Sequence, residues 1–424
     1  MKRSNALDRQ RAIYARGAAG LLQSVPFDPA VLERKAAERM TPEALAYIAG
    51  GAGLERSMAS NTGDFDRWRI VPRMLRDVDE RDTAVDLFGH RIPAPFFLAP
   101  IGVLEMAHRD ADLAIAAAAA QAGIPYIFSN QASVPMERCA AAMETAPRFF
   151  QLYWSRSDEL VASFLQRAEA CGCSAVVLTL DTTMLGWRTR DLDFASLPFL
   201  QGKGIAQYTS DPVFLRLLDT WKTQPTPKPP VTLSAIRTLI AANRRFPGPF
   251  FKNLFSGKGL QAVRVFTQLY SRPNITWKDL PFLREHTSLP VILKGILHPD
   301  DAKKALDYGI DGIYVSNHGG RQVDGSISAI AALPGIVDAV RGKVPVLFDS
   351  GVRGGADAFK ALALGATAVG IGRPYCYALA IRGRAGVSEL LDNWIADLEL
   401  TMGLAGCMSI DEIRQPGTIQ TGRF

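Results

Sequence analysis

Short apolar runs alternate with longer stretches of helical spacing along most of the chain. From about residue 95 onward one unit repeats, in which an apolar run ends in polar or glycine residues and an alanine-rich stretch follows. Eight such runs occur, and we predict a β-strand in each of them: 95–100, 125–130, 148–153, 175–181, 290–295, 311–317, 344–350 and 367–372.

The runs lack the alternation of polar and apolar residues that marks a strand with one wet face. Both faces are therefore covered, as in parallel strands with helices packed outside. The stretches between the runs carry apolar residues at helical spacing and close on glycine, which predicts helices over 111–123, 157–172, 298–309 and 356–365. Eight strand and helix units in series predict an α/β protein with a (β/α)8 TIM barrel.

One connection is several times longer than the others. It runs between the fourth and fifth predicted strands and includes the Pro-rich segment TQPTPKPP. Loops that follow barrel strands open onto the ligand-binding face, so we expect residues 189–275 to form a lid-like insertion. An oligomer contact or a mobile decoration is the alternative.

Residues 1–94 precede the barrel, which we assign to residues 95–424. We predict two helices there, the second with Thr41 as N-cap and Pro42 in the first helical position. The residues that follow read as short strands that close the barrel floor.

Composition places the chain among ordinary globular proteins. Of its 424 residues, 48% are hydrophobic and 21% charged, which excludes disordered, collagenous and disulfide-rich classes. The five cysteines show no zinc-ligand spacing, so we expect no metal site. No apolar stretch has signal-peptide or membrane-span length, which predicts a cytoplasmic protein without a membrane partner. The net charge of +6 comes without a basic run, which argues against nucleic acid and suits a small anionic ligand.

Polar side chains gather where the predicted strands end, the position of active sites in barrel enzymes. The densest segment is SNHGGRQVD, residues 316–324, where His318 offers a base and Arg321 a cation. Asp181, at the end of the fourth strand, could stabilise the imidazolium that forms when His318 takes a proton. The pattern predicts an acid/base site with an anion clamp.

Two later segments indicate a phosphate site. DSGVRGG, residues 349–355, and GIGRP, residues 370–374, place Arg353 and Arg373 ahead of helices after the last two strands. Helix N-termini and guanidinium groups at this place in a barrel are the usual site for a phosphate.

Taken together, these motifs resemble those of the FMN-dependent α-hydroxy acid oxidase and dehydrogenase family. The resemblance includes AYIAGGAG, APIGV, RFFQLY, LTLDT and LKGI in the family's order. Within the family, LTLDTTMLGWRTRDL, LPFLQG and the DSG of residues 349–351 look closest to the lactate 2-monooxygenase branch. The resemblance implies FMN as cofactor, a small L-2-hydroxy acid such as lactate as substrate, molecular oxygen as acceptor and a homo-oligomer of four or eight chains.

The resemblance also implies roles for particular residues. His318 would take the substrate's α-proton with support from Asp181, Arg188 and Arg321 would bind the carboxylate with Tyr47, and Tyr153 would contact the hydroxyl. The residues implied in cofactor binding are Pro100, Gly102, Ser129, Gln151, Thr179, Lys294, Ser316, Asp349, Gly351, Arg353, Gly372 and Arg373.

The outcome of the reaction has two interpretations. Gly102 stands where oxidases of the family commonly have alanine, which suggests room for the keto acid to stay and be decarboxylated oxidatively. Release of keto acid and hydrogen peroxide is the alternative. From other classes, a Schiff-base aldolase using Lys294 and a catalytically silent binding protein also remain. Gln131, where glycolate oxidases carry an aromatic residue, and Val323 depart from the family pattern.

Overall fold

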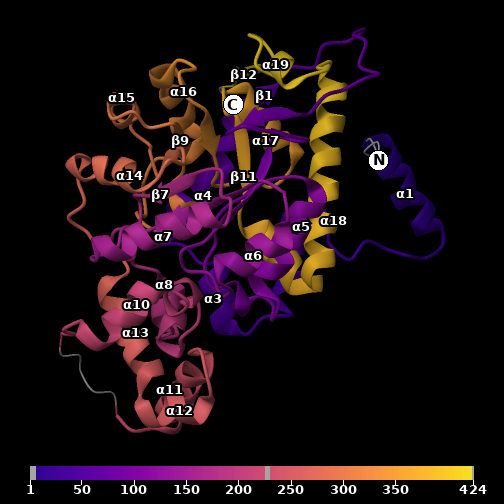
Figure 1. Ribbon diagram of the computed structural model, residues 1–424. Helices are drawn as coiled ribbons and strands as arrows, with labels where there is room; N and C mark the ends of the chain where they lie inside the picture. The colour runs from indigo at the N-terminus through magenta and orange to yellow at the C-terminus, as the bar shows by residue number, and fades with distance from the viewer. Residues whose placement is uncertain (1–5, 225–229, 423–424) are drawn as a thin grey trace.

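The computed structural model describes residues 6–224 and 230–422, and its centre is a closed parallel barrel (Figure 1). Every predicted strand forms within its apolar run. The barrel strands are β4 (Phe96–Leu98), β5 (Tyr126–Phe128), β6 (Arg148–Leu152), β7 (Val176–Thr179), β8 (Val291–Lys294), β9 (Gly312–Val315), β10 (Val346–Phe348) and β11 (Ala368–Ile371). They pair in chain order, and β11 closes the ring against β4, with Val369 opposite Phe96. The TIM barrel predicted from the sequence is confirmed.

Helices surround the barrel and bury apolar side chains against its strands. Those that follow the strands are α5 (Ala111–Ala122), α6 (Met136–Met143), α7 (Asp158–Ala170), α14 (Pro281–His286), α15 (Pro299–Asp307), α16 (Ala329–Val340), α17 (Gly355–Ala363) and α18 (Arg373–Ala405). Local signals set their ends: the Ser157 side chain caps α7 by accepting from the Leu160 N–H, and Gly123 ends α5 with a φ of 70°. The four predicted helices all form.

The N-terminal region differs from its prediction. Four helices form where two were predicted: α1 (Ala6–Ala18), α2 (Pro29–Ala37), α3 (Pro42–Ala49) and α4 (Arg56–Gly63). The Thr41 cap of α3 is confirmed, since its side chain accepts from the Ala44 N–H. Helix α1 lacks a buried stripe and is held instead by polar contacts to α18, including Arg9 to Asn393 at 2.6 Å.

A hairpin closes the floor of the barrel. Strands β2 (Val85–Leu87) and β3 (His90–Ile92) pair antiparallel, and the ring of Phe88 between them packs edge-on against Phe149 of β6, with ring centroids 5.6 Å apart. Strand β1 (Trp68–Ile70) pairs instead with the C-terminal β12 (Ile419–Thr421). The remaining short elements are η1 (Asp64–Arg67), η2 (Leu104–Met106), η4 (Trp277–Asp279), η5 (His318–Gly320) and α19 (Ile410–Ile413).

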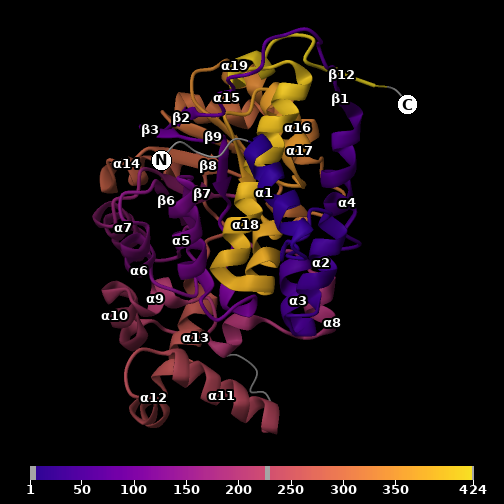
Figure 2. The same ribbon diagram turned by 90° about the vertical axis from the view of Figure 1, so that its right-hand side faces the viewer.

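The insertion after β7 is mostly helical, although the sequence indicated only a long loop. It contains α8 (Thr189–Asp193), η3 (Pro198–Gln201), α9 (Ala206–Thr209), α10 (Pro212–Thr220), α11 (Leu233–Arg245), α12 (Phe250–Ser256) and α13 (Lys258–Leu269). Most of the predicted Pro-rich segment, residues 225–229, lies outside the described residues. The buried Asp211 caps α10 and pairs with Arg167 of α7 at 3.0 Å, which fixes the base of the insertion to the barrel. In both views α11 and α12 lie farthest from the barrel (Figures 1 and 2).

Candidate active site

A cavity of about 290 Å³ opens at the carboxyl ends of the barrel strands. Its wall comes from the strand ends, from α3 and from the insertion. The predicted site residues that line it are Tyr47, Pro100, Gly102, Tyr153, Arg188, Lys294, His318, Arg321, Asp349, Gly351, Arg353, Gly372 and Arg373. The fold therefore brings together residues spread over more than 300 positions of the sequence.

The other predicted residues stand directly behind this wall. Gln151 connects two neighbours there: its amide nitrogen donates to the Thr179 hydroxyl at 3.0 Å, and its amide oxygen accepts from the Ser129 hydroxyl at 3.2 Å. All three side chains are buried. This chain of hydrogen bonds fixes the polar groups at the ends of three adjacent strands.

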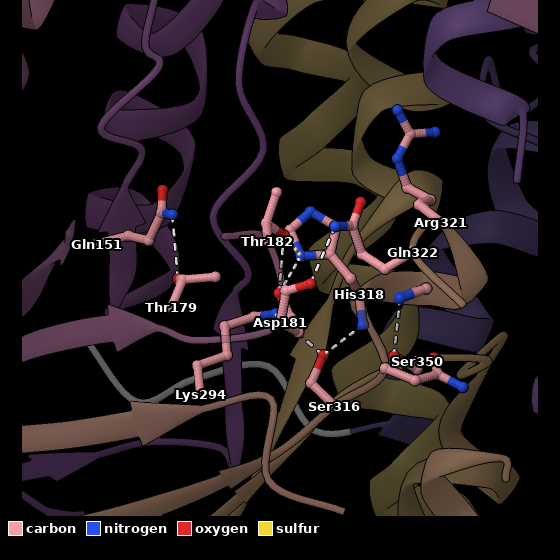
Figure 3. A network of polar contacts seen from close by, with 12 residues as sticks. Gln151, Thr179, Asp181, Thr182, Lys294, Ser316, His318, Arg321, Gln322 and Ser350 are labelled. Carbon is pink, nitrogen blue, oxygen red and sulfur yellow. Dashed lines mark hydrogen bonds and ion pairs between the residues drawn. The ribbon is translucent and has the colours of Figure 1, made fainter. Parts of the chain in front are cut away.

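Asp181 joins His318 to Lys294 (Figure 3). Its Oδ1 lies 2.7 Å from Nδ1 of His318, and its Oδ2 accepts from the Lys294 ammonium at 3.2 Å. Lys294 also donates to the Ser316 hydroxyl at 3.0 Å. Because Nδ1 is engaged by the carboxylate, Nε2 is the imidazole nitrogen left to exchange a proton with a bound molecule.

The electrostatics of this group favour a neutral base beside an ionised carboxylate. Burial alone would raise the pKa of Asp181, but Lys294 and His318 outweigh it and hold that pKa well below its usual range. Burial lowers the pKa of His318, and Lys294 adds to this, although Asp181 opposes both. The imidazole is thus free to accept a proton near neutral pH, and the carboxylate stabilises the imidazolium that results.

The backbone around His318 is unusual and explains the two glycines that follow it. His318, Gly319 and Gly320 all have positive φ, of 58°, 65° and 74°. A Cβ at Gly320 would lie 2.6 Å from the Met58 amide nitrogen, so α4 packs too closely for any other residue. The Ser350 hydroxyl accepts from the Gly319 N–H at 3.1 Å and helps to hold this turn.

Arg188 and Arg321, on the other side of the cavity, form no salt bridge with a described carboxylate, although Asp191 lies near enough to act on both charges. Arg188 donates to the Gln322 side chain at 3.2 Å, and Arg321 donates to the Gly50 carbonyl at 2.6 Å and lies over the Tyr47 ring. Burial, with repulsion from Arg188 and Arg373, lowers the pKa of Arg321 to about 9. A carboxylate bound between these guanidinium groups would relieve that repulsion.

The residues predicted to bind a phosphate line the same cavity. Helix α18 begins directly after Gly372, where an added Cβ would meet nothing within 4 Å, and Arg373 donates only to backbone carbonyls, including that of Gly319 at 2.9 Å. The first N–H of helix α17, that of Gly355, is not available to a phosphate, because it already donates to the Asp397 carboxylate at 2.5 Å. Open space at Gly372 and two guanidinium groups that form no salt bridge with a described carboxylate fit a phosphate group at Arg353 and Arg373.

Several cavity residues were not identified from the sequence. The Thr182 hydroxyl lies 3.0 Å from Nδ1 of His318, and Ser350 has a φ of 82°, which its place in a DSG segment could have signalled. The insertion adds a largely apolar wall made of Leu197, Phe199, Phe266, Thr267 and Tyr270. The sequence around those residues does not indicate that they line a cavity, because their position depends on how the insertion folds.

Known proteins share both the sequence and the fold. Residues 36–420 match the profile of the FMN-dependent dehydrogenase family. An L-lactate oxidase from Lysinibacillus sphaericus is 40% identical over 383 residues, covering 90% of each chain. A 4-hydroxymandelate oxidase from Amycolatopsis orientalis is 38% identical over 91% of this chain and 96% of its own.

Solved structures agree with this result. A crystal structure of mandelate oxidase with (S)-4-hydroxymandelic acid superposes with a TM-score of 0.77 at 36% identity, and the match covers 94% of this chain and 99% of that one. The family and the FMN cofactor expected from the sequence are thereby confirmed, and the cationic cavity at the strand ends suits an anionic cofactor and an anionic substrate. The chain belongs to the FMN-dependent dehydrogenase family.

Proposed function

We propose that this FMN-dependent 2-hydroxy acid oxidoreductase oxidises a small, lactate-like L-2-hydroxy acid to its 2-keto acid, with molecular oxygen as the electron acceptor. The observation that carries the proposal is the His318–Asp181 pair, 2.7 Å apart, facing a cavity in which no salt bridge joins Arg188 or Arg321 to a described carboxylate. A base beside an anion clamp is what removal of a proton from a hydroxy acid requires.

In this proposal His318 Nε2 takes a proton from the substrate, and Asp181 stabilises the imidazolium through Nδ1. Arg188 and Arg321 bind the substrate carboxylate with Tyr47, and Tyr153 contacts the hydroxyl. Burial raises the pKa of both tyrosines, so each stays protonated and can donate a hydrogen bond. The clamp and the base then act on neighbouring parts of one small molecule.

FMN, when bound, supplies the acceptor for the two electrons that leave the substrate. Arg353 and Arg373 would hold the phosphate of FMN. Asp349, Gly351 and Gly372 would lie along its ribityl group, which leads to the phosphate. Lys294 would lie beside the ring, where an ammonium group stabilises added negative charge. Pro100 and Gly102 would form part of the wall beside the ring. The side chains that would fix this wall from behind are those of Ser316, Ser129, Gln151 and Thr179.

The insertion acts as a lid in this proposal. Phe266 and Tyr270, at its last helix, line the cavity, and Arg245 of α11 pairs with Glu105 of η2 at 2.9 Å. These contacts support a cover that excludes water over the site. Among the described residues, no helix is long and apolar enough to span a bilayer. The homo-oligomer and the cytoplasmic location stay predictions.

The alternative aldolase interpretation does not survive. A Schiff base needs a lysine amine that is free to attack a carbonyl group, whereas the Lys294 amine forms an ion pair with Asp181. The chain also belongs to a family whose members depend on FMN. No described feature favours a second function.

We further propose that the keto acid stays in the cavity and is decarboxylated by hydrogen peroxide formed from oxygen. With lactate, pyruvate and hydrogen peroxide would give acetate, carbon dioxide and water. Gly102 supports this in a way the sequence did not indicate: a Cβ there would lie 3.0 Å from both Cβ and the carbonyl oxygen of Gln131. Because Gly102 has no Cβ, the Gln131 residue can lie against the end of the strand. Gln131 also lines the cavity.

Gly102→Ala is therefore expected to push Gln131 away and change the products. The wild type, turning over L-lactate in air, should release mostly acetate and little peroxide, whereas the variant should shift towards pyruvate and peroxide. Product analysis with a peroxide assay measures both. Gly63→Ala is the matched control, because a Cβ at Gly63 would meet nothing within 4 Å. Stoichiometric peroxide from the wild type would contradict oxidative decarboxylation and leave a plain oxidase.

A further inference from the structure

Tyr314 of β9 is a fully buried tyrosine that the proposed reaction does not use. Its ring packs edge-on against Phe97 of β4, with ring centroids 5.4 Å apart. Strands β9 and β4 are not neighbours in the barrel, so the Tyr314 side chain lies in the barrel interior rather than among the outer helices. A phenol hydroxyl in such a place needs a hydrogen-bond partner.

The partner is Asp349, which follows β10 directly. The Tyr314 hydroxyl donates to Oδ2 of Asp349 at 2.6 Å, and the Ser350 hydroxyl donates to Oδ1 at 2.8 Å. Each carboxylate oxygen therefore has one side-chain donor. Burial, with the charge of Asp349, raises the pKa of Tyr314 well above its usual value, so the hydroxyl keeps its proton and stays a donor.

Asp349 reaches from this buried bond into the active-site cavity. It lines the cavity although its residue is only 8% exposed. An ionised carboxylate has about four sites that accept hydrogen bonds, and Tyr314 and Ser350 occupy two of them. The remaining sites can accept from the hydroxyl groups of a bound molecule, and the ribityl chain of FMN carries hydroxyl groups along its length.

Gly370, in the GIGRP segment, makes room for the tyrosine. A Cβ at Gly370 would lie 3.0 Å from the Tyr314 hydroxyl oxygen and 2.8 Å from the Phe97 ring. Gly370 is not among the glycines with positive φ, so its backbone conformation does not require glycine. The space for the Tyr314 hydroxyl does require it. One glycine of a segment that the sequence indicated as a phosphate site thus also serves the bond to Asp349.

The ring of Tyr314 also contacts a second residue of the site. The Lys294 ammonium lies 5.3 Å from the centroid of this ring, within the range of a cation–π contact. Tyr314 therefore contacts Asp349 through its hydroxyl group and Lys294 through its ring. A phenylalanine at this position would keep the second contact and lose only the first.

We propose that Tyr314 is a positioning residue for the cofactor, whose hydroxyl holds the Asp349 carboxylate in the orientation that accepts hydrogen bonds from the ribityl chain of FMN. The inference rests on the assignment of Asp349 to the ribityl group in the proposed function. Without the Tyr314 hydroxyl, Oδ2 of a buried carboxylate loses its donor. The carboxylate then turns to satisfy that oxygen and no longer faces the ribityl chain.

Titration of FMN into the full-length chain after removal of its flavin tests the proposal. Flavin fluorescence gives the dissociation constant without any 2-hydroxy acid present. Tyr314→Phe should weaken FMN binding about tenfold, the scale of one hydrogen bond to a charged group. The reduction potential of the bound flavin should not move, because the ribityl chain is the same in oxidised and reduced FMN and Lys294 keeps its contact with the ring.

Tyr126→Phe is the matched control. Tyr126 is also fully buried on a barrel strand, and its hydroxyl donates to the buried Asp112 at 3.0 Å. Neither residue is among those that line the cavity. The control should lose thermal stability as Tyr314→Phe does, but it should bind FMN as the wild type does. Equal loss of FMN affinity in the two variants would overturn the proposal, since it would reflect only a loosened barrel.

A double-mutant cycle with Asp349→Asn separates positioning from packing. If the hydroxyl acts through the carboxylate, Tyr314→Phe should weaken FMN binding by less than about twofold once residue 349 is asparagine. A full tenfold loss in that background, or unchanged affinity of Tyr314→Phe alone, would overturn the proposal. So would a Tyr314→Phe chain that does not fold while Tyr126→Phe does, which would assign the hydroxyl to the core alone. Unchanged FMN binding by Asp349→Asn would refute the ribityl assignment and this inference with it, while the proposed reaction would stand.

Discussion

Replacing His318 with glutamine is expected to slow reduction of the flavin by substrate roughly 10²–10⁴-fold, the usual contribution of a positioned general base. Glutamine is close to imidazole in size and can still meet Asp181, but it cannot take a proton at the position of Nε2. FMN content should stay the same, because His318 is not among the residues proposed to hold the phosphate. Rapid mixing of the enzyme with substrate in the absence of oxygen measures the rate of flavin reduction directly. An unchanged rate would remove His318 from the role of base.

The pH dependence of that rate gives a second test of the same role. Only neutral His318 can accept a proton, and its pKa lies below the ordinary value of 6.5 because the side chain is buried. The rate should therefore rise with pH through a midpoint below 6.5 and stay level above it. His318→Gln should lose this rise. A midpoint well above 6.5 in the wild type would mean that another group limits the rate.

Arg188→Lys is expected to weaken substrate binding by about 10- to 100-fold, since hydrogen bonds to charged groups contribute roughly 1.5–3 kcal/mol. A lysine supplies a point charge but cannot bind a carboxylate with two parallel N–H groups and also keep the bond to Gln322. The maximal reduction rate should fall much less, because His318 and Asp181 stay in place.

The substrate dependence of anaerobic flavin reduction separates these two quantities. Arg190→Lys serves as the control, since Arg190 lies two positions away and pairs with Glu55 rather than facing the cavity. Unchanged substrate affinity in the Arg188 variant would exclude it from the carboxylate clamp.

The barrel was predictable because its local and global signals agree. Strands buried on both faces read as continuous apolar runs, and capping residues such as Ser157 and Gly123 mark helix ends within a few positions of the sequence. Strand ends in a barrel converge on one face, so the order of the motifs along the chain suffices to assign their polar residues to one site. Thirteen of the predicted site residues line the same cavity.

The remaining features depend on contacts between distant parts of the chain. Helix α1 is held by Arg9 reaching Asn393, and β1 pairs with β12 across almost the whole sequence. The wall formed by Phe266 and Tyr270 exists only because the insertion folds back over the barrel. At Gly102 the sequence indicated missing bulk, but the neighbour that this bulk would meet, Gln131, is set by the three-dimensional arrangement of two strand ends.

Anaerobic mixing with a panel of 2-hydroxy acids, followed by product analysis after oxygen is admitted, is the decisive test of the proposed function. We expect L-lactate or a close homologue to bleach the flavin rapidly and the D-enantiomer to leave it oxidised. Oxygen should then restore the yellow colour, with acetate as the main product from lactate. A flavin that no 2-hydroxy acid reduces, or a reduced flavin that oxygen does not reoxidise, would contradict the proposed function.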